Sequence, residues 1–187
     1  MTPPAAMHYV RHPGLLGPVR RQKLVENLNR ASTKRARSSD LGRTGRGTTE
    51  QLIPGTDEYV SAELTTLRQV VASVCYQMTA RVFALPDPAR LTPQVFPVWM
   101  TGSVEAPPHQ RPHVDNKNGV SPLVTAVYYA AISNTDGGEI VIGVGPDQIV
   151  MSPAEDDLVA FPGNTLHAVN DLRAGDRLSV VCNFYLA

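Results

Sequence analysis

The architecture of this chain is set by residues 111–132, RPHVDNKNGVSPLVTAVYYAAI. Two runs of strand-forming residues, 111–115 and 123–132, lie on either side of an Asn-Lys-Asn-Gly sequence that is typical of a turn. Side chains two residues apart on a strand point to the same face. We therefore expect His113 and Asp115 to present an imidazole and a carboxylate side by side.

Short strand-forming runs separated by Pro, Gly, Asn and Asp continue through the second half of the chain. The predicted strands are 94–104, 111–115, 123–132, 139–144, 147–151, 158–161, 166–169 and 177–186. Strands that follow a helical N-terminal part indicate an α+β fold. Two sheets that close over each other as a jelly roll leave an interior pocket. We expect such a core over residues 92–187.

The N-terminal part, residues 1–91, has helical character instead. Apolar residues recur at three- and four-residue steps over 18–31 and 57–84, which predicts two amphipathic supporting helices. Residues 32–56 are basic and rich in Ser, Thr and Gly, so they are predicted to be a mobile loop, either disordered or a lid. A chain of 187 residues suits one domain, here 1–187 as a whole.

The formal net charge of zero conceals an asymmetry between the two parts of the chain. Residues 1–50 hold ten Lys or Arg and three Asp or Glu, a net charge of +7, while residues 51–187 carry −7. A basic segment of this kind either contacts nucleic acid or an acidic partner, or docks on its own acidic domain. Self-docking or simple solvation is the interpretation we favour.

The cysteines and the distribution of apolar residues indicate where in the cell the protein is expected. Cys75 and Cys182 are far apart in sequence and lie in apolar surroundings, so buried free thiols are expected rather than a disulfide or a zinc site. The chain has no apolar run of about 18 residues, which argues against a membrane span. Its first residues, MTPPAAMHYVRHP, lack the apolar segment of a secretory signal, so a cytoplasmic location is expected.

A second histidine, His167, completes a possible metal site with His113 and Asp115. Two imidazoles and one carboxylate are the ligand set of non-haem Fe(II) oxygenases, which keep open metal positions. Arg177 and Ser179 follow shortly after and could hold the far carboxylate of an oxo-acid cosubstrate. The alternative is that all five are unrelated surface or capping residues.

The alternation of the last strand supports the first interpretation. Its apolar face consists of Leu178, Val180, Cys182, Phe184 and Leu186, and its other face consists of Arg177, Ser179, Val181, Asn183 and Tyr185. The second face lies either in water, as on an edge strand, or inside a polar-lined barrel. A buried arginine without an anion is unfavourable, so the second arrangement implies a bound acid.

Three segments, HVDNKNG at 113–119, VTAVYY at 124–129 and GGEI at 137–140, resemble the prolyl-hydroxylase branch of the Fe(II)/2-oxoglutarate dioxygenases. The resemblance is closest to hypoxia-inducible-factor-type prolyl hydroxylases. It implies a double-stranded β-helix core and a requirement for Fe(II), 2-oxoglutarate and O2.

The resemblance also implies roles for individual residues. It makes His113, Asp115 and His167 the iron ligands, and it assigns Arg177 and Tyr129 to the distal carboxylate of 2-oxoglutarate. The alternative for Tyr129 is ordinary core packing, although alternation places it on the same face as residues 125 and 127.

Several residues depart from the family pattern, and these departures bear on which substrate and which reaction are expected. The family's other cosubstrate tyrosine has no clear counterpart, and Trp99 or Met100 falls near its position. Asn183 stands where the family has a tryptophan, and also where a related nucleic-acid demethylase family has a second arginine, so a nucleic-acid substrate is not expected. Asp115 fills the carboxylate position that related halogenases leave vacant for chloride, which favours hydroxylation.

The function expected from the sequence is hydroxylation of an aliphatic C–H bond in a small molecule or amino acid, in a biosynthetic pathway for example. The short chain and the altered pocket favour this over hydroxylation of a prolyl residue in a protein or peptide. A non-catalytic jelly-roll protein that binds a metal or an oxo-acid is a further alternative. Arg111, Asn116, Asn183 and Trp99 are the expected substrate contacts.

Overall fold

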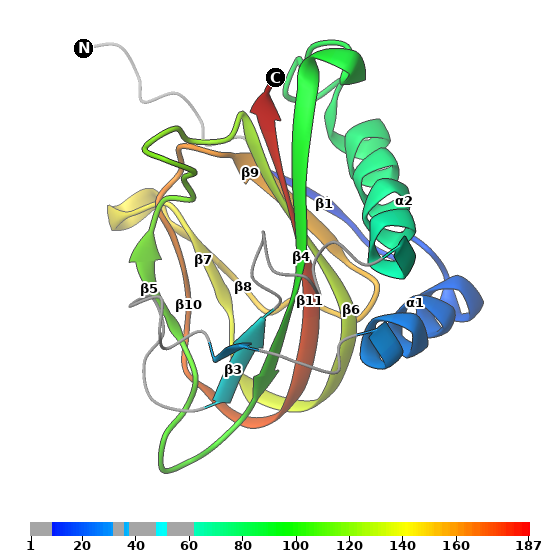
Figure 1. Ribbon diagram of the computed structural model, residues 1–187. Coiled ribbons are helices and arrows are strands. Elements are labelled where there is room, and N and C mark those ends of the chain that lie inside the picture. The colour runs from blue at the N-terminus through cyan, green and yellow to red at the C-terminus, as the bar shows by residue number, and fades with distance from the viewer. Residues whose placement is uncertain (1–8, 32–35, 38–47, 52–61) are drawn as a thin grey trace.

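The computed structural model describes residues 9–31, 36–37, 48–51 and 62–187 (Figure 1). Its helices are α1 (Pro18–Ala31), α2 (Ala62–Thr79) and the short 3-10 turns η2 (Pro88–Arg90) and η3 (Gly145–Asp147). Its strands are β1 (Val10–His12), β2 (Ala36–Arg37), β3 (Thr48–Gln51), β4 (Leu91–Thr101), β5 (Gln110–His113), β6 (Val124–Gly137), β7 (Ile140–Ile142), β8 (Ile149–Met151), β9 (Leu158–Pro162), β10 (His167–Val169) and β11 (Leu172–Leu186).

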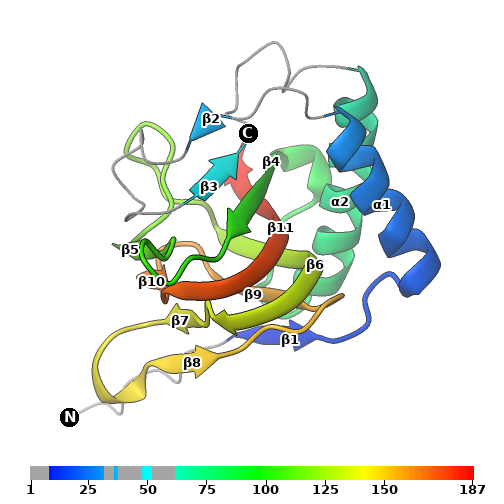
Figure 2. The same ribbon diagram turned by 90° about the horizontal axis from the view of Figure 1, so that it is seen from below.

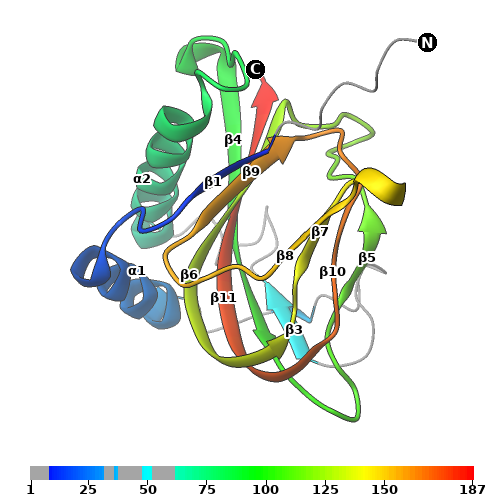
Figure 3. The ribbon, with the colours of Figure 1, turned by 180° about the vertical axis from the view of Figure 1, so that it is seen from behind.

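The strands form two sheets, and every pairing is antiparallel. The larger sheet has seven strands in the order β1-β9-β6-β11-β4-β3-β2, and the smaller has four in the order β5-β10-β7-β8. Figure 2 shows the larger sheet as a curved layer with the helices outside it, and Figure 3 shows the two sheets from behind. This arrangement confirms the predicted α+β jelly roll.

Both long helices cover the outer face of the larger sheet (Figure 1). The apolar layer between helices and sheet includes Leu24, Leu28, Val71, Cys75, Val95, Ala126, Val180, Cys182 and Phe184. Four residues of the predicted apolar face of β11, Leu178, Val180, Cys182 and Phe184, therefore lie in this core, while Leu186 at the end of the strand is exposed. In the described part of the chain, neither helix combines the length and the apolar character needed to cross a membrane.

The two cysteines meet in this layer as free, fully buried thiols, which confirms the prediction. Burial raises the pKa of the Cys182 thiol well above its usual value, and the neighbouring Cys75 acts in the same direction. The Cys182 thiol is accordingly protonated, and both buried cysteines pack as small apolar side chains.

The second helix is shorter than the predicted range of 57–84. It ends at Thr79, and the chain leaves it through a turn in which Ala84 has a φ of 49° and the Leu85 amide donates to the Ala80 carbonyl. This left-handed closure is a common way to satisfy the last carbonyls of a helix. Residues 57–61 lie outside the described residues.

The predicted loop 32–56 contains two short strands. β3 pairs with β4 along the edge of the larger sheet, and β2 pairs with β3. Their sequences lack apolar alternation, so pattern reading could not find strands that are added through backbone hydrogen bonds. The rest of this segment, including any lid, lies outside the described residues.

Strand boundaries also differ from the prediction at the start of the core. The expected strand 111–115 is Gln110–His113, so Asp115 lies in the loop beyond β5 and not on the strand. The last strand begins at Leu172 instead of residue 177 and pairs with β4 from Asp176 to Leu186. β5 ends where its pairing with β10 ends, at the His113 and His167 partners.

A truncation in the core tests this packing. Leu158 is fully buried beneath the helices, so Leu158→Ala should lower the free energy of unfolding by about 2–5 kcal/mol. Val150 on β8 is 50% exposed, and Val150→Ala should change it by no more than about 0.5 kcal/mol. Denaturant titration measures both, and equal losses would contradict the assigned core.

Candidate metal centre and adjoining pocket

Both histidines of the predicted metal set come from neighbouring strands of the smaller sheet. His113 ends β5 and His167 begins β10, and the two residues are direct partners in the antiparallel pairing. Their ring centroids lie 4.3 Å apart. The ring of Phe161 packs against His167 at a centroid distance of 4.8 Å. Strand register thus brings together two imidazoles that are distant in sequence.

Each imidazole is oriented by a nearby backbone carbonyl. Nδ1 of His113 lies 2.7 Å from the carbonyl oxygen of Arg111, and Nδ1 of His167 lies 3.1 Å from that of Thr165. Because a carbonyl can only accept a hydrogen bond, both histidines donate from Nδ1. In the neutral form of each ring, Nε2 then carries the lone pair that a metal requires.

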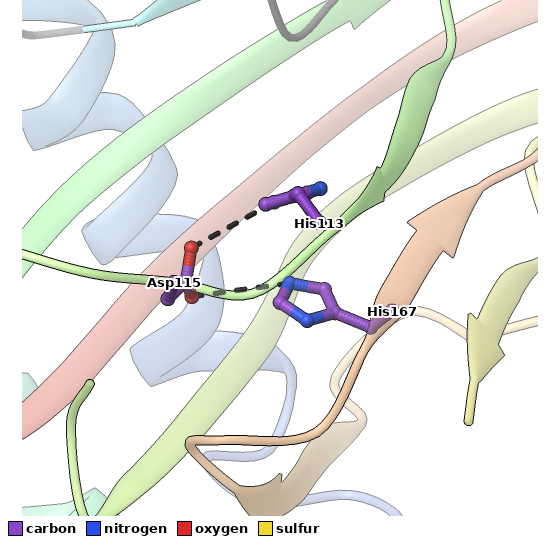
Figure 4. Close-up of side chains that lie close together, drawn as sticks. All are labelled: His113, Asp115 and His167. Carbon is purple, nitrogen blue, oxygen red and sulfur yellow. Dashed lines mark ion pairs between the residues drawn. The ribbon is translucent and has the colours of Figure 1, made fainter. Parts of the chain in front are cut away.

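Asp115 supplies the carboxylate, which points toward both rings (Figure 4). Oδ1 lies 3.7 Å from Nε2 of His113, and Oδ2 lies 3.9 Å from Nε2 of His167. One ligand atom from each of the three residues lies within 4.8 Å of the others. Two imidazoles and one carboxylate form the donor set of non-haem Fe(II), with further metal positions left for small molecules. The residues therefore fit an iron(II) ion.

The larger sheet contributes two donors to the same carboxylate. Thr125 Oγ1 and Asn183 Nδ2 each donate to Oδ2 of Asp115 over 3.2 Å. Thr125 and Asn183 are themselves direct partners in the pairing of β6 with β11. Asp115 is only 6% exposed. Hydrogen-bond donors offset the unfavourable burial of such a carboxylate.

A cavity between the two sheets runs from the metal-binding residues to Arg177. Its lining comes from both sheets and consists of Phe96, Val98, Gln110, His113, Asp115, Thr125, Val127, Tyr129, Ile140, His167, Val169, Arg177, Ser179 and Val181. The inward face of β11 is therefore the face that was predicted to line a polar interior, which decides against an edge strand in water.

Arg177 is a buried cation at the far end of this cavity. Nη1 donates to the carbonyl oxygen of Gly138 over 2.6 Å, and Nη2 lies 2.7 Å from the sulfur of Met100. Nε has no hydrogen-bond partner, and no carboxylate of the described residues lies within ion-pair distance of the guanidinium. Burial lowers the pKa of Arg177, and Tyr129 opposes this effect. An anion bound here would relieve the unfavourable burial.

Tyr129 and Ser179 lie beside this guanidinium and are partners across β6 and β11. The Cζ atom of Arg177 is 5.7 Å from the centroid of the Tyr129 ring. Burial raises the pKa of Tyr129 to about 12, although Arg177 acts in the opposite direction. The phenol is therefore neutral at physiological pH and able to donate a hydrogen bond, as is the Ser179 hydroxyl.

The residues predicted for substrate contact do not share one location. Trp99 lies on the helix side of the larger sheet, where its indole nitrogen donates to Asn29 of α1 over 3.1 Å. This position, outside the cavity, does not support a substrate contact, because alternation along β4 turns Met100 and not Trp99 inward. Arg111 and Asn116 are exposed and flank His113 and Asp115 in the sequence. Asn183 is 2% exposed and contacts Asp115.

Some residues of the site were not predicted from the sequence. Thr125 was placed on the correct face by alternation, but its contact with Asp115 depends on a loop conformation that alternation does not describe. Gly138 has a φ of 77°, and a Cβ there would lie 3.4 Å from Nη1 of Arg177. The Gly137-Gly138 pair was the available signal for this close approach of backbone to the guanidinium.

Comparison with known proteins gives no match by sequence and many by structure. Neither a protein-family model nor a curated protein matches the chain. A 2OG-Fe(II) oxygenase-family oxidoreductase from Burkholderia pseudomallei superposes with a TM-score of 0.71 at 16% identity, covering 95% of this chain and 84% of that one. A Trichoplax adhaerens prolyl hydroxylase, solved with a peptide fragment of the hypoxia inducible factor oxygen degradation domain, gives 0.69 at 17% identity, over 95% and 83%.

A third similar structure is SnoN, a non-heme alpha ketoglutarate dependent epimerase from nogalamycin biosynthesis. It superposes with a TM-score of 0.70 at 14% identity, over 97% of this chain and 80% of that one. At such low identities the similarity is one of fold. The chain thus has the fold of the 2OG-Fe(II) oxygenases and prolyl hydroxylases, as its sequence motifs implied.

Loss of one imidazole tests the metal centre. His167→Ala should weaken Fe(II) binding by at least about a hundredfold, because one of three protein ligands is removed. His109→Ala is the matched control, since His109 pairs with Asp171 outside the metal-binding set. Anaerobic calorimetry measures both affinities. Unchanged Fe(II) affinity in His167→Ala would show that the ligand assignment is wrong.

Proposed function

We propose that this protein is an Fe(II)- and 2-oxoglutarate-dependent oxygenase that hydroxylates an aliphatic C–H bond of a small molecule or amino acid. The observation that carries the proposal is the position of Arg177. A buried guanidinium with an unsatisfied Nε lines the same cavity as the two histidines and Asp115. An oxo-acid with a second carboxylate can reach the metal with one end and the guanidinium with the other.

The protein groups around that cosubstrate have complementary tasks. Arg177 offers charge, and the hydroxyls of Tyr129 and Ser179 offer neutral donors at the same end of the cavity. When bound, Fe(II) with 2-oxoglutarate and O2 would supply the oxidising chemistry, with succinate and CO2 as coproducts. Phe96, Val98 and other apolar side chains line the walls of this cavity, and an apolar lining disfavours water around a reacting group.

A non-catalytic role in metal or oxo-acid binding fits the same residues less well. Structural metal sites generally close their coordination with protein ligands, whereas the set here offers three. A second candidate substrate is a prolyl residue in a peptide, which the structural similarity to a peptide-bound prolyl hydroxylase favours. Both substrate classes are compatible with the fold, since a fold supports many reactions.

Removal of the guanidinium tests the cosubstrate assignment. Arg177→Ala should weaken 2-oxoglutarate binding to the Co(II)-loaded protein by about 2 kcal/mol or more, roughly thirtyfold, because a buried charge-assisted contact is lost. Arg173→Ala is the control, because Arg173 is exposed and pairs with Asp136. An unchanged dissociation constant in Arg177→Ala, measured by calorimetry, would rule out the assigned role.

Turnover tests the reaction itself. The Fe(II)-loaded protein, incubated in air with 2-oxoglutarate, should release succinate and add one oxygen atom to a member of a panel of free amino acids, small metabolites and proline-containing peptides. Mass spectrometry identifies the oxidised product, and His167→Ala should form none. Tight binding of Fe(II) and 2-oxoglutarate without succinate release for any substrate class would instead support the non-catalytic alternative.

A further inference from the structure

The pairing of strands fixes the two histidines of the metal-binding set but does not fix the orientation of the Asp115 carboxylate. His113 and His167 are fixed as partners on β5 and β10, but Asp115 lies beyond the end of β5, in the connection to β6. A loop carboxylate can rotate and offer either one oxygen or both to a metal. The number of positions left for cosubstrate and O2 depends on which of these occurs.

The two donors on the larger sheet resolve this choice. Thr125 and Asn183 stand opposite each other on β6 and β11, and both donate to the same oxygen, Oδ2 of Asp115, over 3.2 Å. A carboxylate oxygen has two lone-pair directions. Two donors fill both of them, so Oδ2 has no lone pair left for a metal.

The orientation of the Asn183 amide follows from the same chemistry. The Asp115 carboxylate can only accept, so the Nδ2 group must face it, and Oδ1 must point elsewhere. This Oδ1 atom is buried without a hydrogen-bond partner. The Asn183 side chain therefore leaves its own Oδ1 without a hydrogen bond so that Nδ2 can donate to Asp115. A buried acceptor without a partner is unfavourable, which suggests that the contact with Asp115 has a functional role.

We propose that Thr125 and Asn183 are positioning residues that make Asp115 a single-oxygen ligand, presented through Oδ1. This inference rests on the proposed function, because it concerns the same metal. It reassigns Asn183 from substrate contact to support of the metal ligand. With Oδ2 withheld, each of the three protein side chains would offer one ligand atom to the metal, and its other positions would stay available to the cosubstrate and O2.

Variants of similar volume distinguish the effect of losing a hydrogen bond to Asp115 from the effect of changed packing. Thr125→Val and Asn183→Leu each remove one donor with little change in volume, while Thr125→Ser keeps the hydroxyl. Gln94→Leu is the matched control. Gln94 lies on β4, the other strand that pairs with β11, where it is the direct partner of Asn183, and it is not one of the two donors to Asp115. The affinity of the full chain for Co(II), the visible spectrum of bound Co(II) and the thermal unfolding of the metal-free protein are measured for each variant.

Thr125→Val and Asn183→Leu should weaken Co(II) binding about ten- to a hundredfold, as the loss of groups that orient metal ligands typically does. They should also alter the Co(II) spectrum, because the carboxylate can then bind through both oxygens. Thr125→Ser and Gln94→Leu should retain the affinity and spectrum of the unmodified protein.

The outcomes separate this inference from the proposed function. An unmodified protein that binds no Co(II) refutes the metal centre itself. An unmodified protein that binds Co(II), with unchanged affinity and spectrum in both donor variants, overturns only the positioning role. A lowered unfolding temperature with an unchanged spectrum would show that the donors merely stabilise the fold. If Asn183→Leu fails to fold, the comparison of Thr125→Val with Thr125→Ser decides.

Discussion

Two charged groups buried in one cavity constrain the rest of this structure. Asp115 and Arg177 are 6% and 5% exposed, and the two residues do not form an ion pair with each other. Burial of a charge is unfavourable unless hydrogen bonds or a counter-ion compensate for it. Asp115 is compensated by hydrogen bonds from Thr125 and Asn183, whereas the partners of the Arg177 guanidinium among the described residues are neutral. The difference is what makes one end of the cavity suited to a cation and the other to an anion.

Alternation in the sequence predicted the faces of the core strands but not the loop geometry. The inward face of β11, with Arg177 and Ser179, and that of β6, with Tyr129, follow directly from the two-residue period. The same reasoning placed Asp115 on a strand, where it does not lie, although it still converges with His113. Convergence there depends on long-range hydrogen bonds to the larger sheet, and contacts of this kind leave no periodic trace in the sequence.

The fold of this protein does not by itself determine which reaction it catalyses. The structures that it resembles include prolyl hydroxylases and an epimerase, so the jelly roll alone does not select a reaction. The choice of reaction class depends instead on the residues that the two sheets place in the cavity. Trp99 illustrates the point, since it is close in sequence to Met100 but faces α1 instead of the cavity.

The residues of the site come from both sheets. The smaller sheet holds both imidazoles, while the larger holds Arg177 and the donors to Asp115. The distance between the sheets therefore sets the geometry of the metal centre. That distance is maintained by inward apolar side chains of both sheets, among them Ile140, Phe161 and Val98. Close packing makes such a spacing stiff, so a change in the volume of these side chains should shift the histidines relative to the carboxylate as well as lower the stability of the fold.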